Sequence, residues 1–480
     1  MTDPHAMFGR IKAAGIRTVF AADGCASQPA PDSSLEWISA PAAVARTLAM
    51  AAGELGPTPG VYFDGDWSLV TGLVEETADR RVLPVNASLS TLRTQLPPAW
   101  FSFPEWDDRP PPTQTADGSD AAHRPDPADA AAHVNQHTGD GAGPGRRSEG
   151  AQPPGGERPD IGTAQNLLDG VAAILLGPGV RRAGRESDWR AFAVSTGLGV
   201  FNTVGAKGFF EWDDPLHLGT VGLQGGDAAT TGLPPRSLLA VGLDRAELPG
   251  RAWEPLIKEE VSVHAARLMA ERGVVMADRS DGAGRYAARA FYDAVSAVAL
   301  GLYSGATIPD GPAVLMGKLS AILRRHRLPI SVVAASPGPG GFLVGRMFPT
   351  PAGANLLVPA RSVPGAAVGL AVAAALARPD LIPVALVDDL ACPVTNAMLE
   401  WARRQRLAIL VVHWQDRRGD PDELSRRLVS SVTDLRSGNT RDRVLIAEGH
   451  SAIGATIRVL VEAFGPIELW DGHYNQLGVT

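Results

Sequence analysis

The stretch "VALVDDLACPVTNAMLEWARRQRLAILVVHWQD", residues 384–416, has the pattern of a strand, a helix and a second strand. Its first apolar run ends in Asp388 and Asp389, and its second apolar run ends in Asp416. Continuous apolar strands joined by helices are typical of parallel sheets that are covered on both faces. Because such sheets bind ligands at the carboxyl ends of their strands, the pattern predicts a site at that edge.

The same alternation of strands and helices runs through most of the chain. In the N-terminal part, "GIRTVFAADG" (15–24) predicts a strand that ends in a glycine turn. "APAAVARTLAMAAGEL" (40–55) and "SLVTGLVEETADRR" (68–81) each predict a helix.

Similar segments continue to the end of the chain and fall into three groups. They predict an α/β fold of three doubly wound parallel-sheet domains, at residues 1–104, 161–305 and 306–480.

The segment at 105–160 separates the first two domains. It contains almost no large apolar side chains and is rich in Pro, Gly, Ala and Asp. Such a segment cannot bury enough apolar surface to offset the entropy lost on ordering. We therefore predict that it is a disordered linker.

Composition argues against a nucleic-acid partner and against a membrane partner. The chain has 480 residues, 45% of them hydrophobic, and a formal net charge of −8. The acidic balance, with no basic cluster that contains interleaved aromatics, argues against a nucleic-acid partner. The longest small-apolar run, at 365–377, is too short and too rich in alanine to span a bilayer, and the first residues have no signal-peptide layout. We therefore expect a cytoplasmic protein without a membrane partner.

The aspartates at the two strand ends have two interpretations. Carboxylates at adjacent strand ends repel each other unless a cation lies between them, and oxygen ligands suit Mg²⁺. Asp389 and Asp416 would then hold the metal. Alternatively, Asp389 precedes a helix and serves only as its cap. The spacing alone leaves both interpretations open.

Three other turns look like active-site motifs but are incomplete. "LLGPGVRRAG" (175–184) and "SPGPGGFLVG" (336–345) follow strands, yet neither completes a dinucleotide or Walker pattern. We expect their glycines to serve tight turns. "AEGHSAIGAT" (447–456) carries a serine between a strand and a helix, but Ile453 stands where a nucleophile elbow needs its second glycine.

The order of these segments resembles the thiamine-diphosphate-dependent decarboxylase and carboligase family, the group of acetolactate synthase and pyruvate decarboxylase. "GIRTVFAADG" is similar to the opening of the family's pyrimidine-binding domain. "GLGVFNTVGAKGFFEWDDPLHLGTVGLQG" (197–225) is similar to its central, Rossmann-like domain. "GAAVGLAVAAALARPDLIPVALVDD" (365–389) looks like the entry to its diphosphate-binding domain. The resemblance therefore implies these three domains in this order.

The resemblance also implies a metal motif, Gly-Asp-Gly followed at a fixed spacing by a ligand asparagine. Asp389 takes the aspartate position, and Asp416, 27 residues later, stands where the asparagine belongs. The backbone carbonyl of Arg418 would be the third protein ligand. The flanking glycines are replaced by Asp388 and Leu390, which makes the site more negative and its backbone less free beside a cofactor diphosphate.

Two further family positions have changed. In the family, a turn with a large apolar side chain, Met or Ile, supports the two rings of the cofactor. This turn corresponds to residues 362–365, where Ser362 and Pro364 would contact the cofactor. Pro364 is smaller and stiffer than the Met or Ile of the family. The glutamate that activates the cofactor would lie near Ala42, but residues 39–46 contain no acid. Loss of a general acid or base typically lowers the rate by a factor on the order of 10²–10⁴.

The resemblance leaves two functions open. In the first, the chain binds thiamine diphosphate and Mg²⁺ and decarboxylates or ligates a 2-oxo acid, with an unidentified group in place of the glutamate. In the second, it is a catalytically inactive relative that serves as a binding or partner subunit. Family active sites form between subunits, so an active chain is expected to be a homodimer or homotetramer. No residue supports FAD binding.

Overall fold

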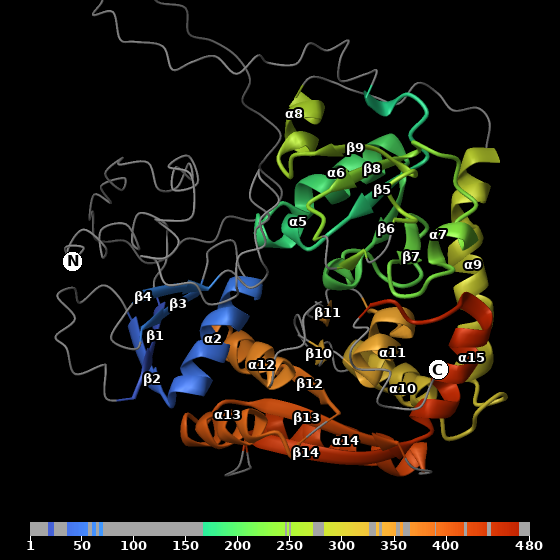
Figure 1. Ribbon diagram of the computed structural model, residues 1–480. Helices are drawn as coiled ribbons and strands as arrows, with labels where there is room; N and C mark the ends of the chain where they lie inside the picture. Colours follow the sequence, from blue (N-terminus) through green and yellow to red (C-terminus); the bar gives the residue numbers. More distant parts are fainter. Residues whose placement is uncertain are drawn as a thin grey trace, which may run out of the picture.

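We describe the protein from a computed structural model (Figure 1). The structure describes residues 18–23, 36–55, 60–63, 67–70, 167–244, 247–248, 251–271, 283–325, 333–335, 338–351, 356–358, 365–388, 390–416, 420–438 and 443–469. The predicted linker at 105–160 lies outside these residues. So do Ser362, Pro364, Asp389, Arg418 and the side chain of Asp416.

The N-terminal sheet has the strand order β2-β1-β3-β4. Its strands are β1 (Thr18–Ala22), β2 (Glu36–Ala40), β3 (Gly60–Phe63) and β4 (Trp67–Val70). β1 pairs in parallel with β2 and with β3, whereas β3 and β4 are antiparallel. This sheet is therefore mixed rather than purely parallel as predicted.

The helix predicted over 68–81 is wrong in its first residues, because residues 68–70 belong to β4. The sequence between β3 and β4 is Asp-Gly-Asp, and an Asp-Gly pair between two apolar runs favours a hairpin. The antiparallel pairing with β3 outweighs the helical pattern here. The helix predicted over 40–55 is confirmed as α2 (Ala42–Leu55).

The central sheet has the strand order β7-β6-β5-β8-β9, and all of its neighbouring strands are parallel. The strands are β5 (Ala173–Leu176), β6 (Gly199–Asn202), β7 (His217–Thr220), β8 (Leu238–Val241) and β9 (Ile257–Val261). The helical segments of this region are α5 (Gly179–Arg182), α6 (Glu186–Thr196), the 3-10 turn η3 (Val204–Ala206), α7 (Asp227–Thr230) and α8 (Ala265–Glu271).

The C-terminal sheet has the strand order β11-β10-β12-β13-β14 and is parallel throughout. Its strands are β10 (Val333–Ala335), β11 (Leu356–Leu357), β12 (Val384–Val387), β13 (Ile409–Asp416) and β14 (Val444–Ser451). The helices around it are α10 (Pro312–Arg325), α11 (Pro339–Met347), α12 (Ala366–Ala377), α13 (Pro393–Arg404), α14 (Pro421–Ser437) and α15 (Ile453–Phe464), whereas the preceding helix α9 (Ala283–Tyr303) packs on β7 of the central sheet. The stretch at 384–416 thus forms β12, α13 and β13, as predicted.

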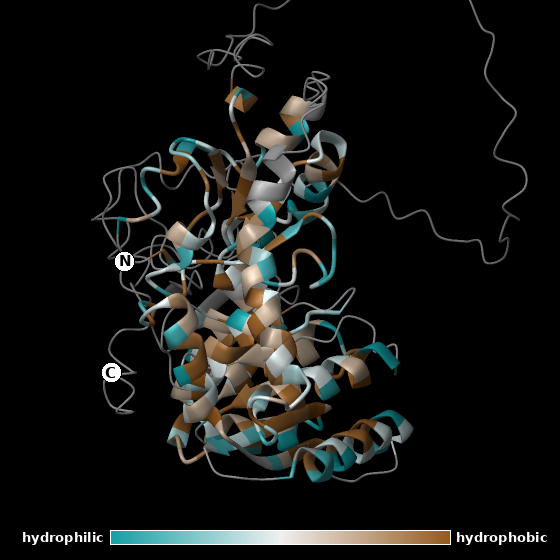
Figure 2. Cartoon of the chain, turned by 90° about the vertical axis from the view of Figure 1, so that its right-hand side faces the viewer, coloured by the Kyte–Doolittle hydropathy of each residue, from teal (hydrophilic) through white to brown (hydrophobic). Residues whose placement is uncertain are grey.

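Alternate residues of β12 belong to different apolar clusters on the two faces of this sheet. Val384 and Leu386 pack with α10, α11 and α14, whereas Ala385 and Val387 pack with α12, α13 and α2. This is the two-face burial that a continuous apolar strand indicates. In Figure 2 the strands and the inward helix faces are brown, whereas teal residues lie mainly on the outer helices.

Helix α12 is packed between the C-terminal sheet and α2, which explains its small-residue sequence. Every residue from 366 to 375 is buried. A Cβ atom at Gly369 would lie 2.8 Å from Cγ2 of Thr47, so the glycine lets the two helices approach closely. The indole of Trp401 in α13 also donates to the carbonyl of Ser39 at 3.2 Å. The first and last sheets are therefore joined by helix packing within one chain, at the lower left of Figure 1.

Helix α11 joins the C-terminal sheet to the central one through a buried arginine. Arg346 donates to both carboxylate oxygens of Asp227, at 2.7 and 2.9 Å, and to the carbonyl of Thr220 at 3.0 Å. Its Nε donates to the side chain of Gln224 at 3.1 Å. Both members of the ion pair are fully buried. This network fixes how the two regions pack, while the predicted domain boundary at 305/306 stays a prediction.

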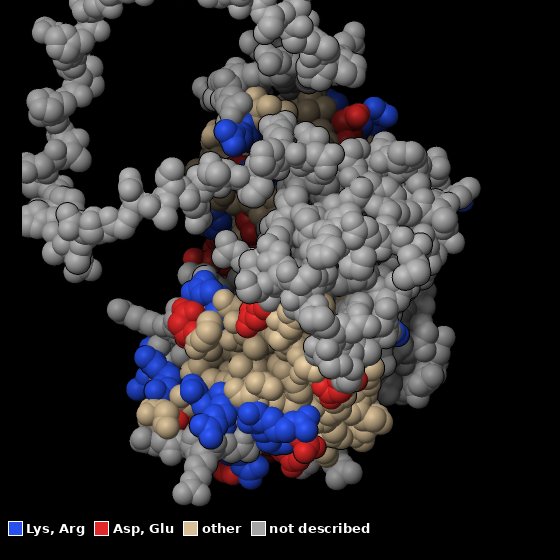
Figure 3. Space-filling view, turned by 90° about the vertical axis from the view of Figure 1, so that its left-hand side faces the viewer, with Lys and Arg blue, Asp and Glu red and all other residues tan. Residues whose placement is uncertain are grey.

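Basic side chains gather on the lower part of the face shown in Figure 3, in the region of α13. The exposed arginines at the end of this helix are Arg403, Arg404 and Arg406. Positive charge near a helix C-terminus interacts favourably with the helix dipole, which gives these residues a local structural role. Among the described helices, none combines the length and the apolarity needed to cross a membrane.

Candidate functional site

The order of the C-terminal strands reverses between β10 and β12. β11 lies on one side of β10, and β12, β13 and β14 follow on the other side. In open parallel sheets, ligands bind in the crevice outside the carboxyl ends of the strands at such a switch point. The two chain segments that leave the sheet here are the turn that leads into α11 and Asp388. This edge is therefore the candidate site.

The side chain of Asp388 lies against the N-terminus of α11. The backbone N–H of Gly340 donates to Oδ2 of Asp388 at 3.1 Å. A Cβ atom at Gly340 would lie only 2.2 Å from Oδ1 of Asp388, so only glycine admits the carboxylate at this distance. Gly338 precedes the helix at φ +142°, a conformation that favours glycine. The glycines of this turn therefore serve both its tight geometry and the approach of a carboxylate.

Charge explains why a carboxylate is stable in this position. The first N–H groups of an α-helix have no partner within the helix, and the helix N-terminus carries a partial positive charge. α11 has no acidic residue in its own first turn, so the negative charge comes from β12. Asp388 thus occupies a place where helices commonly bind anions.

Trp414 brings a second donor to the same point. Its side chain is 3% exposed, and its Nε1 would lie 2.8 Å from a Cβ atom at Gly340. Within the described residues, this indole N–H has no hydrogen-bond partner. A buried donor without a partner is energetically costly, which marks this point as unusual.

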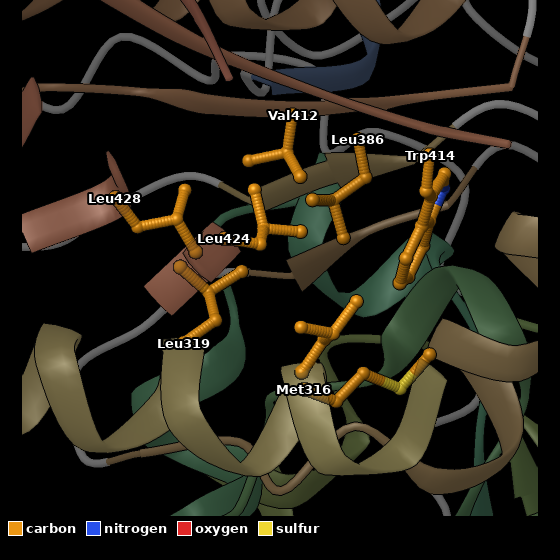
Figure 4. A pocket seen from close by; sticks show the side chains of 8 residues that line it. Met316, Leu319, Leu386, Val412, Trp414, Leu424 and Leu428 are labelled. Carbon is orange, nitrogen blue, oxygen red and sulfur yellow. The ribbon is translucent and has the colours of Figure 1, made fainter. Parts of the chain in front are cut away.

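The far side of Trp414 faces an apolar pocket between the sheet, α10 and α14 (Figure 4). The residues that line it are Leu315, Met316, Leu319, Leu386, Val412, Trp414, Leu424 and Leu428. The figure shows the aliphatic side chains of the sheet and of the helices pointing toward one another. No charged group lines this pocket, so we interpret it as a packing gap in the core.

The predicted metal ligands are only partly described. β12 and β13 are neighbouring parallel strands with Val387 beside His413, and Asp416 is the last residue of β13. Asp389 and the Arg418 carbonyl lie outside the described residues, so their roles stay predictions. Among the residues that the structure describes, no group of three or more His, Cys, Asp or Glu side chains could hold a metal.

The other predicted cofactor contacts also stay predictions. Ser362 and Pro364 lie outside the described residues. The side chain of Leu390 is partly buried and packs against the apolar cluster on the α12 and α13 side of the sheet.

The expected glutamate position lies at the start of α2. Ala42 is the first residue of this helix and is exposed, and its first turn contains no acidic residue. Glu36 begins β2, at the opposite end of that strand. The nearby acid that sequence reasoning missed is Asp23, which directly follows β1 and accepts a hydrogen bond from the Ser39 hydroxyl at 2.9 Å. An acid directly after an apolar strand was the signal that could have identified it.

The switch point of the central sheet lies between β5 and β8 and is filled by backbone. The N–H of Gly179 donates to the carbonyl of Gly242 at 2.9 Å. A Cβ atom at Gly177 would lie 2.3 Å from the same oxygen. The glycines of the turn at 175–184 therefore serve tight packing, as predicted.

A cluster of buried polar and aromatic side chains lies in the interior of the central region. Nζ of Lys207 donates to the Thr220 hydroxyl at 3.3 Å and lies 5.0 Å from the centre of the Trp212 ring. Burial, followed by repulsion from Arg346, lowers the pKa of Lys207 to about 7.

His217 belongs to the same cluster. Its ring nitrogens lie 3.1 Å from the Trp212 carbonyl and 3.2 Å from Oδ1 of Asn202. Burial, followed by repulsion from Lys207, lowers the pKa of His217 to about 4. Both side chains are at least 97% buried, so we interpret them as part of the core.

Comparison with known proteins gives one family assignment for the central region. Residues 171–244, from just before β5 to just beyond β8, match the family model described as "Thiamine pyrophosphate enzyme, central domain". No curated protein matches the chain. The matched range contains Lys207, His217 and the glycines that fill the central switch point, Gly177, Gly179 and Gly242. The chain therefore contains a thiamine pyrophosphate enzyme central domain.

Proposed function

We propose that this chain is a non-catalytic relative of thiamine pyrophosphate enzymes that acts as a binding or partner subunit. The observation that carries the proposal is the start of α2, where the family's activating glutamate would lie. Ala42 is exposed there, and the first turn of the helix has no acidic side chain. An alanine can neither accept nor donate a proton, so the step that makes the cofactor reactive has no group at this position.

The described residues at the edge of the C-terminal sheet also do not fit a cofactor diphosphate. The carboxylate of Asp388 already accepts the N–H of Gly340 at the N-terminus of α11. A diphosphate in the same place would meet a like charge at close range, which is strongly unfavourable away from bulk water. This supports a role without cofactor chemistry.

The proposal is tested by following the exchange of the acidic thiazolium proton of thiamine diphosphate in D₂O by NMR, with Mg²⁺ present. An enzyme of this class must accelerate that exchange. We expect the wild-type chain to leave the rate at that of the free cofactor. Acceleration by the wild-type chain would overturn the proposal.

A pair of variants separates the missing glutamate from other causes. Ala42→Glu restores a carboxylate at the expected position, and Ala43→Glu places one on the neighbouring exposed residue. We expect neither variant to accelerate exchange, because the Asp388 carboxylate still occupies the N-terminus of α11, where the cofactor diphosphate would bind. Acceleration by Ala42→Glu alone would mean that the cofactor binds and that only the glutamate is missing.

The second candidate function is decarboxylation or ligation of a 2-oxo acid with thiamine diphosphate and Mg²⁺, in a homodimer or homotetramer. It is favoured by the position of Asp416 at the end of β13, beside the strand that leads to Asp389. Calorimetric titration of the cofactor with Mg²⁺ distinguishes the two candidates. Micromolar binding that disappears in Asp389→Ala, together with a dimer or tetramer by light scattering, would establish the second candidate instead.

A further inference from the structure

Three features meet at the switch point of the C-terminal sheet and form what we call the α11 cradle. They are the N–H of Gly340, the glycine turn at Gly338 and the indole Nε1 of Trp414. Two of the three are hydrogen-bond donors, and the helix end adds partial positive charge. The cradle is therefore built to hold an anion, and the carboxylate of Asp388 lies in it.

The indole of Trp414 suggests that an anion larger than the Asp388 carboxylate suits the cradle. Its N–H is buried beside Gly340 and has no partner in the described part of the chain. A phosphate group has three or more acceptor oxygens, so it can accept from the helix end and from a neighbouring donor together. A carboxylate held on β12 has two oxygens and a fixed direction of approach.

We infer that Asp388 is a built-in anion that keeps the α11 cradle closed to phosphate groups. Removing this side chain would leave the donors in place and open the cradle to inorganic phosphate or pyrophosphate. This inference rests on the proposed function and deepens it, because it names the anion that takes the place of a diphosphate at this edge of the sheet. Titration of pyrophosphate measures anion binding alone, so it can fail while the proton-exchange test of the proposed function still holds.

The test is calorimetric titration of inorganic pyrophosphate into the full-length wild-type chain and the Asp388→Gly variant. We expect the variant to bind pyrophosphate at least about tenfold more tightly than the wild type. Asp380→Gly removes the same charge from an exposed loop, where Asp380 pairs with Arg378, and is the matched control. Equal binding by the wild type and Asp388→Gly would overturn the inference, as would an equal gain in Asp380→Gly.

Two further variants show which property of Asp388 and which donor of the cradle matter, and Asp388→Ala, with the same expected gain, replaces Asp388→Gly if the glycine variant folds poorly. Asp388→Asn removes the charge but keeps the cradle filled, so we expect little gain in pyrophosphate affinity. Trp414→Phe in the Asp388→Gly background removes the indole donor, and we expect it to weaken pyrophosphate binding roughly 2- to 10-fold. A full gain of affinity in Asp388→Asn would contradict closure by occupancy, and unchanged affinity on loss of the indole would contradict the cradle.

Discussion

The protein has two sheet switch points, and different groups fill them. In the central sheet, the crevice is closed by backbone, because Gly177 and Gly179 pack directly on Gly242. In the C-terminal sheet, the corresponding space beside Gly340 is filled by the side chain of Asp388. A backbone contact persists through any change of a neighbouring side chain. The comparison teaches that only the second crevice can be opened by a single substitution.

The two regions depend on each other through α11, which begins at the α11 cradle and carries Arg346 near its other end. Arg346→Ala would leave the carboxylate of Asp227 buried without its cation. We expect the free energy of unfolding to fall by about 3–5 kcal/mol, measured by urea denaturation. Arg378→Ala, at an exposed pair with Asp380, should change it by less than about 0.5 kcal/mol. Equal effects of the two substitutions would show that the buried pair does not hold the two regions together.

Lys207 provides a contrast with Arg346, because its buried amino group donates to a neutral hydroxyl and not to a carboxylate. Its pKa is lowered from 10.5 to about 7, so between these values the unfolded chain binds more protons than the folded one. The free energy of unfolding should therefore rise with pH across this window and level off below it.

Lys207→Met removes the buried charge. It should raise the free energy of unfolding at neutral pH by about 1–4 kcal/mol and abolish the rise on going to alkaline pH. Lys318→Met, at a partly exposed pair with Asp422, is the control and should keep the pH dependence. A methionine variant that is less stable than the wild type at neutral pH would contradict the interpretation.

Gly177→Ala tests the backbone closure of the central crevice. Its Cβ atom would lie 2.3 Å from the Gly242 carbonyl, and a rigid backbone cannot move aside cheaply. We expect a loss of about 1–3 kcal/mol in the free energy of unfolding. Gly317→Ala is the control, because its Cβ atom in α10 would meet nothing closer than 4.0 Å. If both substitutions are tolerated equally, the central crevice is not closed as described.

Gly340→Ala tests the side-chain closure of the C-terminal crevice. In the wild type, its Cβ atom would lie 2.2 Å from Oδ1 of Asp388, so the variant should be destabilised. In the Asp388→Gly background that obstacle is gone, and the cost should be smaller by about 0.5–3 kcal/mol. A double-mutant cycle by urea denaturation measures this coupling. Additive effects would mean that the carboxylate does not fill the space beside Gly340.

Much of the fold follows from the sequence, because continuous apolar strands must be buried on both faces whatever lies around them. The runs that form β12 and β13 are examples. β4 was missed because its helical pattern competes with pairing to β3, and that pairing depends on the fold of the hairpin.

The site was less predictable than the fold, because its contacts also depend on the pairing of segments that are far apart in the chain. The sequence shows that Asp388 adds negative charge beside the expected diphosphate, because of its position in the motif. The sequence does not show that the Asp388 carboxylate accepts a hydrogen bond at the N-terminus of α11. Gly340 lies 48 residues away in the chain and is brought near only by the pairing of β10 and β12. The repulsion between Lys207 and Arg346 likewise depends on how α11 packs on the central sheet, because the two residues are 139 positions apart in the chain.

The central claim is that Asp388, and not a phosphate group, fills the α11 cradle. A crystal structure of the wild-type chain grown with excess pyrophosphate and Mg²⁺ tests it most directly. We predict electron density for the Asp388 carboxylate within hydrogen-bond distance of the Gly340 N–H, with no phosphate beside it. Pyrophosphate bound at the N-terminus of α11, with the Asp388 side chain turned away, would contradict the account.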